Sequence, residues 1–377
     1  MSEEPIPFSK PYFTSEDIEE INARIDKVLR SGWLTSGPLV EEFEKTFAEF
    51  VGTKYGVALN SCTAALHATL LALGIKSGDE VIVPSDTFVA TANAVLYVGA
   101  KPVFADSDSK SFNVSPVDIE EKISDRTKAI IVVHLAGNPC DMKEISRIVE
   151  DHKLMLVEDC AHAHGAKYRN TNCGVLGEVG CFSFYPTKVM TCAEGGMVTT
   201  NNEALAEKVR IIRNHGRAGY GPNENTEIGF NFRLSDVHAA VGLSQLRHAR
   251  DFVFERNRVA ERYDQEIRKI DWIRPQDVED GNLCSYYAYI VKLEEDSPVN
   301  RDEAMEILRN KGIGTSVLYH PIHLQPLYTR LFGYRKGILP VAEELGERSL
   351  ALPLFNGMKD EQVDRIIDIV RELVDKE

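Results

Sequence analysis

The stretch Leu154-Met-Leu-Val157, followed at once by Glu158-Asp-Cys-Ala-His162, indicates how this chain folds. Its apolar residues are continuous and do not alternate with polar ones, which is typical of a strand buried on both faces of a parallel sheet. Two acids follow where the strand would end. A carboxylate beside a buried sheet is costly unless a cation or a hydrogen-bond donor meets it. The stretch therefore predicts an inner strand whose carboxyl end carries functional groups.

Similar apolar runs alternate with helical patterns over the N-terminal two thirds of the chain. Strands are expected over 57–59, 80–84, 102–105, 129–133 and 154–157. Helices are expected over 14–30, 38–51, 63–73, 88–98 and 141–152. This alternation predicts an α/β fold, with a doubly wound, mainly parallel central sheet flanked by helices.

The pattern changes after Ser235. Long helices are expected over 235–268, one strand over 286–291, and further helices over 301–311 and 359–374. We therefore expect a large domain over 1–245, which includes the N-terminal helical segment, and a smaller C-terminal α+β domain over 246–377.

Composition excludes several classes of protein. The 377 residues carry a net charge of −15, which argues against binding to nucleic acid or to an anionic membrane surface. No apolar run reaches about 18 residues, and the N-terminus Met1-Ser-Glu-Glu-Pro5 is acidic, so a cytoplasmic location is expected. The seven cysteines include no CxxC pair, which predicts reduced thiols and no structural zinc or other metal site.

Four segments are expected where strands end, which is where open α/β sheets bind ligands. The first is Asn60-Ser-Cys-Thr63, where N–H groups at a helix start could hold a phosphate; an ordinary helix cap is the commoner explanation. The second is Asp86-Thr-Phe88, whose ring could stack on a planar cofactor or simply belong to the core.

The third segment carries Asp159, whose partner is left open by the sequence. A protonated cofactor nitrogen or a salt bridge would each satisfy a carboxylate there. A metal is a third possibility, with Asp159, His162 and His164 as ligands. A zinc hydrolase is accordingly one alternative function.

The fourth segment is Ser183-Phe-Tyr-Pro-Thr-Lys188, followed by Glu194-Gly-Gly-Met197. A serine there could bind phosphate, and a lysine could hold the aldehyde of pyridoxal 5'-phosphate (PLP) as a Schiff base. Asp159 could keep the pyridine nitrogen of PLP protonated, so that the ring accepts electrons. A phosphate turn, a stacking ring, an acid, a serine and a lysine together predict a PLP pocket.

The chain resembles the DegT/DnrJ/EryC1/StrS family of sugar aminotransferases, within the fold-type I, aspartate aminotransferase-like PLP enzymes. The resemblance runs nearly end to end. Besides the segments above, it is carried by Ser31-Gly-Trp-Leu-Thr-Ser-Gly-Pro38, Asn214-His-Gly216, Gly229-Phe-Asn-Phe-Arg-Leu-Ser-Asp236 and Leu318-Tyr-His-Pro-Ile-His-Leu-Gln-Pro-Leu-Tyr328.

The resemblance implies a role for each matching residue. Lys188 would bind the cofactor and move the proton, Asp159 would pair with the pyridine nitrogen, and His162 would lie near the 3-hydroxyl group. The remaining cofactor contacts would be a ring stack by Phe88, phosphate contacts by Cys62, Thr63 and Ser183, and a contact by Asn231 with the phosphate in the neighbouring subunit of a homodimer. The expected substrate-side residues are Trp33, Thr35, Tyr319, His320 and His323.

The implied reaction moves an amino group from an amino acid, glutamate by resemblance, to a nucleotide-linked keto-sugar, with pyridoxamine 5'-phosphate as the intermediate form of the cofactor. The alternatives are an aminotransferase for a cyclitol or another carbocyclic ketone, a PLP-dependent sugar dehydratase, and a PLP-binding regulator. Family dehydratases carry histidine where this chain has Lys188, which favours the aminotransferase. Cys62 replaces a common glycine and His162 a common glutamine, and His320 stands where relatives vary.

Overall fold

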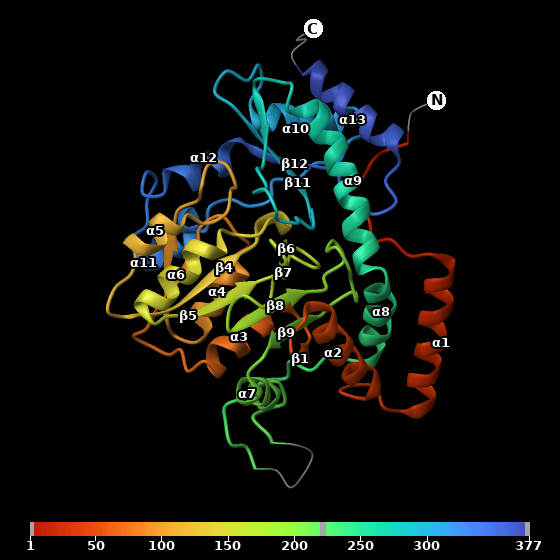
Figure 1. The fold of residues 1–377 in the computed structure, drawn as a ribbon, viewed down its shortest axis with the longest axis vertical. Coiled ribbons are helices and arrows are strands. Elements are labelled where there is room, and N and C mark those ends of the chain that lie inside the picture. The colour runs from red at the N-terminus through yellow and green to blue at the C-terminus, as the bar shows by residue number, and fades with distance from the viewer. Residues whose placement is uncertain (1–3, 219–223, 374–377) are drawn as a thin grey trace.

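The computed structural model describes residues 4–218 and 224–373 (Figure 1). Part of the acidic start Met1–Pro5 therefore lies outside the described residues. The last residue of the helix predicted over 359–374 also lies outside them. Among the described residues, no helix combines the length and the apolar character that a membrane crossing requires.

A seven-stranded sheet forms the centre of the molecule, in the order β1-β9-β8-β5-β4-β2-β3. Its strands are β1 (Tyr55–Leu59), β2 (Glu80–Pro84), β3 (Lys101–Ala105), β4 (Thr127–Val133), β5 (Met155–Asp159), β8 (Val179–Ser183) and β9 (Gly196–Thr200). Only β9 runs antiparallel to both of its neighbours, β1 and β8. The expectation of a mainly parallel sheet is confirmed, and the carboxyl ends of the other six strands share one edge.

Helices cover both faces of this sheet. The helices of this part are α1 (Ser15–Ser31), α2 (Pro38–Val51), α3 (Cys62–Ala72), α4 (Ala90–Tyr97), α5 (Pro116–Glu121), α6 (Met142–His152), α7 (Glu203–Arg213) and α8 (Asp236–Arg247). On one face, Val81 and Val83 of β2 pack with residues of α3, α4 and α7. On the other face, Ile82 packs with residues of α5 and α6. Successive side chains of a strand point to opposite faces, so β2 is apolar from Val81 to Pro84, after the charged Glu80.

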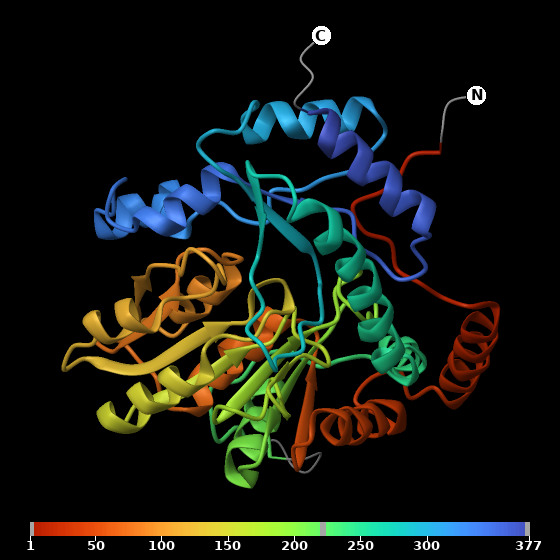
Figure 2. The ribbon, with the colours of Figure 1, turned by 45° about the horizontal axis from the view of Figure 1, so that its top comes forward.

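A second, three-stranded antiparallel sheet lies beyond the carboxyl edge of the first (Figures 1 and 2). It consists of β10 (Ile273–Pro275), β11 (Tyr289–Leu293) and β12 (Ser349–Leu352). Its core cluster includes residues of α9 (Ala249–Ile267), α10 (Arg301–Asn310) and α13 (Asp360–Glu372), and also Ile6 from the N-terminal segment. The division into domains at 245/246 stays a prediction.

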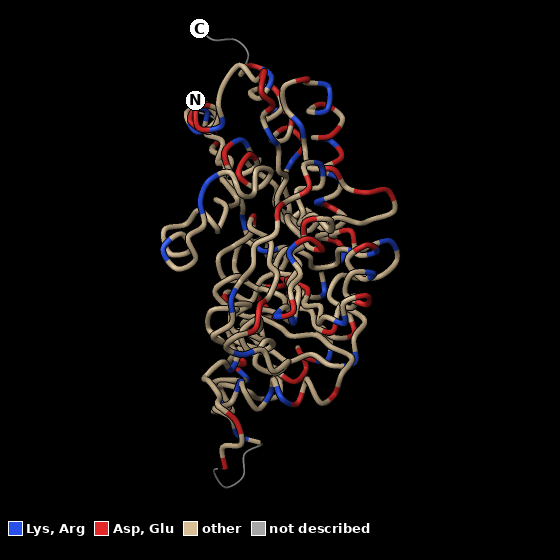
Figure 3. Tube along the Cα trace, turned by 90° about the vertical axis from the view of Figure 1, so that its left-hand side faces the viewer, with Lys and Arg blue, Asp and Glu red and all other residues tan. Residues whose placement is uncertain are grey.

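The remaining short elements complete the chain. They are the strands β6 (Lys167–Tyr168) and β7 (Thr171–Asn172), the 3-10 turns η1 (Leu135–Gly137) and η2 (Ile322–Leu324), and the helices α11 (Pro326–Phe332) and α12 (Pro340–Arg348). Both ends of the described part of the chain lie at the end of the molecule that carries the small sheet. Acidic and basic residues are interspersed along the trace (Figure 3), so the negative net charge is spread over the molecule.

Candidate active site

A cavity of about 390 Å³ lies at the shared carboxyl edge of the large sheet. It brings together most of the cofactor residues that the sequence predicts, and one predicted substrate-side residue. These residues are Cys62, Thr63, Phe88, Asp159, His162, Ser183, Lys188 and Tyr319. They come from five different segments. Four of these follow β1, β2, β5 and β8 and meet because the strands end at the same edge, and the fifth, with Tyr319, lies between α10 and η2.

Helix α3 begins at this cavity with Cys62 and Thr63. Ser61 caps the helix, and its hydroxyl oxygen accepts a hydrogen bond from the N–H of Ala64 at 3.1 Å. The first N–H groups of a helix have no intrahelical acceptor, and the helix dipole favours an anion beside them. Burial raises the pKa of the Cys62 thiol, so this residue is available for a backbone contact rather than as a thiolate.

Gly196, the first residue of β9, packs directly against this helix start. A Cβ atom at position 196 would lie only 2.6 Å from the nitrogen of Cys62. Only glycine leaves room for that approach. Gly196 is thus required by its packing against the start of α3.

Asp159 is the last residue of β5 and is 5% exposed. Its carboxylate accepts hydrogen bonds from the Thr91 hydroxyl at 2.8 Å and from the N–H of Ala161 at 3.1 Å. Burial raises the pKa of this carboxyl group, against the opposing effect of those two donors and of Lys188. A cation placed against Asp159 in the cavity would therefore be strongly favoured.

Lys188 lies in the turn after β8 and is partly buried. Its backbone N–H donates to the carbonyl oxygen of Tyr185 at 3.0 Å. Its Nζ lies 4.3 Å from the ring centroid of Tyr287, a distance at which the aromatic face attracts an ammonium group. The Tyr287 hydroxyl in turn lies 3.2 Å from the hydroxyl of Thr187. Tyr287 thus helps to position the lysine.

His162 lies between two tyrosine rings. Its ring stacks on Tyr287 with centroids 4.0 Å apart, and its Nε2 lies 3.0 Å from the Tyr319 hydroxyl. Its Nδ1 accepts a hydrogen bond from the N–H of Ala136 at 3.3 Å. Burial and the nearby Lys188 hold the pKa of His162 well below its usual range. The ring is therefore neutral, with its proton on Nε2, where it donates toward Tyr319.

The other predicted residues lie outside this cavity. Trp33 is 54% exposed and its ring N–H donates to the carbonyl of Thr35 at 3.0 Å, while the Thr35 hydroxyl donates to the carbonyl of Leu234. Asn231 and His320 are exposed. His323 is completely buried, and both of its ring nitrogens are engaged, so in this structure it has no contact with the cavity.

Two functional residues were missed by sequence reasoning. Thr91 stands three residues after Phe88, and its hydroxyl group donates to Asp159. The only local indication in the sequence is that this hydroxyl comes one helical turn after the predicted stacking ring. Tyr287 comes from the loop before β11, about a hundred residues beyond Lys188. No spacing rule connects it to the site.

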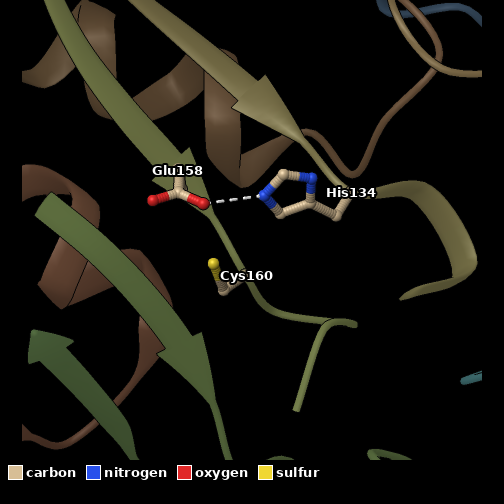
Figure 4. Close-up of side chains that lie close together, drawn as sticks. All are labelled: His134, Glu158 and Cys160. Carbon is tan, nitrogen blue, oxygen red and sulfur yellow. Dashed lines mark hydrogen bonds and ion pairs between the residues drawn. The ribbon is translucent and has the colours of Figure 1, made fainter. Parts of the chain in front are cut away.

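The metal alternative can be judged from the arrangement of side chains. His164 packs among the rings of Phe47, Phe182 and Phe184 and does not line the cavity. The described residues bring together a different group with metal-binding atoms, namely His134, Glu158 and Cys160 (Figure 4). The geometry therefore does not favour a metal site formed by Asp159, His162 and His164.

Glu158 in that group has a structural role. It meets Nε2 of His134 at 3.0 Å and accepts N–H bonds, each of 2.8 Å, from Gly174, Leu176 and Gly177. The backbone N–H of Cys140 donates a hydrogen bond to the other ring nitrogen of His134, Nδ1. These hydrogen bonds satisfy the carboxylate and both ring nitrogens, which accounts for the burial of an acid at this position.

The cavity fits PLP by its own chemistry. A carboxylate that is buried, a helix start suited to a phosphate, and a partly buried lysine open onto one space. Asp159 would hold the pyridine nitrogen, the start of α3 and Ser183 the phosphate, and Lys188 the aldehyde.

The chain is similar to known aminotransferases and to proteins of sugar biosynthesis. The model of the DegT/DnrJ/EryC1/StrS aminotransferase family matches residues 15–371. The spore coat polysaccharide biosynthesis protein SpsC of Bacillus subtilis is 39% identical, with 98% of this chain and 97% of SpsC covered. The GDP-perosamine synthase of Escherichia coli O157:H7 is 36% identical, with 97% and 98% covered.

A solved structure extends the comparison to the cofactor. The PLP form of Spr1654 from Streptococcus pneumoniae, described as a sugar aminotransferase, has a TM-score of 0.92 and 31% identity to this chain. The alignment covers 98% of each chain.

Proposed function

The chain belongs to the DegT/DnrJ/EryC1/StrS aminotransferase family, whose cofactor is PLP, and on that basis we propose that it transfers an amino group from an amino acid to a nucleotide-linked keto-sugar. Glutamate is the proposed donor. The observation that carries the proposal is that Asp159 and Lys188 line one cavity, together with the start of α3. The names of the relatives, which include a GDP-perosamine synthase, support a nucleotide sugar as acceptor.

When bound, PLP supplies an electron-accepting ring that stabilises negative charge at the carbon next to the transferred amino group. Asp159 holds that ring by its pyridine nitrogen. The Thr91 hydroxyl and the N–H of Ala161 donate hydrogen bonds to the carboxylate and orient it. In the pair formed by this carboxylate and the pyridine nitrogen, the nitrogen would therefore carry the proton. Phe88 covers one face of the ring.

Lys188 serves as the group that binds the cofactor aldehyde and, once released by the incoming amine, as the base that moves a proton. Its Nζ has the Tyr287 ring beside it and no carboxylate in ion-pair contact among the described residues. The amine is therefore held in place without being fixed in a salt bridge. The same lysine would act in both halves of the reaction, which predicts ping-pong kinetics.

The phosphate contacts are proposed for Ser183 and for the backbone of Cys62 and Thr63. His162 is proposed beside the cofactor 3-hydroxyl group, where its Nε2 proton is shared with Tyr319. Tyr319 and His320 are proposed on the substrate side.

A second copy of the chain is proposed to complete the site. Asn231, Trp33 and Thr35 lie outside the cavity, and both Asn231 and Trp33 are exposed. In a homodimer, Asn231 would reach the phosphate bound by the neighbouring subunit. Residues that one protomer leaves exposed are those available to its partner.

The test is a panel of nucleotide-linked keto-sugars, each supplied with glutamate and PLP. We expect at least one of them to yield an amino-sugar and an equal amount of 2-oxoglutarate. A cyclitol ketone in the same panel tests the carbocyclic alternative. Loss of water from the sugar without consumption of glutamate would contradict amino transfer.

A further inference from the structure

His323 is one of two histidines in the segment Tyr319-His-Pro-Ile-His323, and it lies behind the cavity rather than in it. It is 0% exposed, as is Ser85, and Glu343 is 5% exposed. Nδ1 of His323 lies 2.7 Å from the Ser85 hydroxyl, and Nε2 lies 3.0 Å from Oε1 of Glu343. The three side chains form one buried hydrogen-bonded chain.

The protons in this chain can be assigned from its neighbours. Oε1 of Glu343 also accepts from the N–H groups of Gly337 at 2.8 Å and Leu339 at 3.3 Å, so Glu343 is an ionised acceptor. Nε2 of His323 must then donate. Burial lowers the pKa of His323, so the ring is neutral and its Nδ1 accepts from the Ser85 hydroxyl.

Both ends of the chain are anchored. Ser85 directly follows β2, and its carbonyl oxygen accepts the N–H of Ile322 at 2.9 Å. Glu343 belongs to α12, whose first turn is fixed by bonds from the N–H groups of Val341 and Ala342 to Asp106, just after β3. The segment around His323 is therefore held against the sheet.

Two rings of the cavity stand directly beside this anchor. Phe88 is three residues after Ser85, and Tyr319 is four residues before His323. Their ring centroids lie 6.1 Å apart, and both rings line the cavity. The distance between the two rings therefore depends on how closely the two segments are joined behind them.

We propose that His323 is a positioning residue, which joins the segment of Tyr319 to the segment of Phe88 and thereby sets how the two rings pack against each other in the cavity wall. The cavity beside these two rings then selects the acceptor ketone by its fit. That last step rests on the proposed function, whereas the connection between the segments does not.

The test uses the full chain with PLP bound and three variants. His323→Leu removes both hydrogen bonds, and Ser85→Ala removes one and deletes only a hydroxyl group. Tyr328→Phe is the matched control. Tyr328 belongs to the adjacent helix α11, and its replacement removes a partly buried hydrogen bond of 2.7 Å to Asn93 without touching the chain of Ser85, His323 and Glu343.

Hydrogen–deuterium exchange followed by mass spectrometry is the first readout. We expect faster exchange in His323→Leu over both 85–91 and 316–325, a smaller increase in Ser85→Ala, and no change at either segment in Tyr328→Phe. Faster exchange over 316–325 with unchanged exchange over 85–91 would overturn the proposal. If His323→Leu does not fold, Ser85→Ala decides the matter by the same criterion.

The second readout is steady-state kinetics with an accepted keto-sugar. We expect KM for the ketone to rise by about tenfold in His323→Leu with little change in kcat, as for a loss of uniform binding. An unchanged KM would contradict the role in acceptor fit. If no ketone is aminated by the wild type while the exchange pattern holds, the proposed function fails and the connecting role of His323 stands.

Discussion

The hydroxyl group of Thr91, in the first turn of α4, donates a hydrogen bond of 2.8 Å to Oδ2 of Asp159, the last residue of β5. This bond holds a buried carboxylate in one orientation toward the cavity. It also offsets part of the effect of burial, which raises the pKa of Asp159. Thr91, which the sequence did not predict as a site residue, thus supports Asp159, which it did predict.

Removal of this hydroxyl group should weaken cofactor binding. In Thr91→Val the carboxylate loses a charge-assisted bond, of the kind that contributes about 1.5–3 kcal/mol. We expect the dissociation constant for PLP to rise by about 10- to 100-fold. Titration of the cofactor-free protein with PLP, followed by absorbance, measures it. Thr91→Ser keeps the donor and should bind nearly as wild type; equal affinity of Thr91→Val and wild type would contradict the assigned bond.

Replacement of the lysine should separate binding from proton transfer. Lys188→Ala leaves Asp159, Ser183 and the start of α3 in place, so PLP should still bind, without a covalent link. Turnover should fall by at least about 10²–10⁴-fold, the usual contribution of a positioned base. Mass spectrometry after borohydride reduction checks the link. A reduced adduct on another lysine of the variant would count against Lys188.

Asp86 should make the stability of the cofactor-free protein depend on pH. It lies next to Tyr319 around a small cavity, and burial raises its pKa to about 7. An unfolded chain has an aspartate pKa of about 4. The stability associated with protonated Asp86 is therefore complete below about pH 4 and is lost as the pH rises toward 7.

Asp86→Asn removes this loss. The difference in free energy of unfolding between Asp86→Asn and wild type should therefore change with pH. It should increase in favour of Asp86→Asn by about 1–2 kcal/mol between pH 4 and pH 7, after allowance for solvent screening. Urea unfolding at several pH values and one fixed protein concentration measures it. A difference that does not vary with pH would show that Asp86 has an ordinary pKa.

Mixed dimers should reveal a shared active site. Lys188→Ala and Asn231→Ala are each expected to lower activity when assayed alone. If Asn231 serves the partner's cofactor, a mixed dimer has one site with both defects and one site with neither. Unfolding and refolding of equal amounts together should restore about one quarter of the wild-type activity. No recovery above the sum of the separate variants would contradict a contribution of Asn231 across the interface.

Local patterns predicted most of the central fold. The runs at 80–84, 129–133 and 154–157 became β2, β4 and β5, because strands buried on both faces keep a continuous apolar sequence. The segment that became β9 was not predicted as a strand. Its direction, antiparallel to β1 and β8, depends in part on pairing with β1, which lies more than a hundred residues earlier in the chain.

The site was predictable to the extent that its residues follow strand ends. Asp159 and Ser183 are the last residues of β5 and β8, and Lys188 lies in the short connection after β8, so sequence order translates into proximity. Tyr287 comes from the distant loop before β11, which no local pattern connects to Lys188. His323 was expected to contact substrate because of its neighbours in sequence, but burial is a property of packing that one segment cannot reveal.

The antiparallel direction of β9 has a consequence for insertions and deletions in the chain. Because β9 is bonded on both edges and Gly196 must meet Cys62, the number of residues between Ser183 and Gly196 is fixed, although the segment that contains Lys188 is a connecting loop. Deletion of one residue there would shift the strand by one position. Met197 and Val198 would then each point to the face of the sheet opposite to the one that it occupies now. Homologous enzymes should therefore vary this loop by substitution and conserve its length.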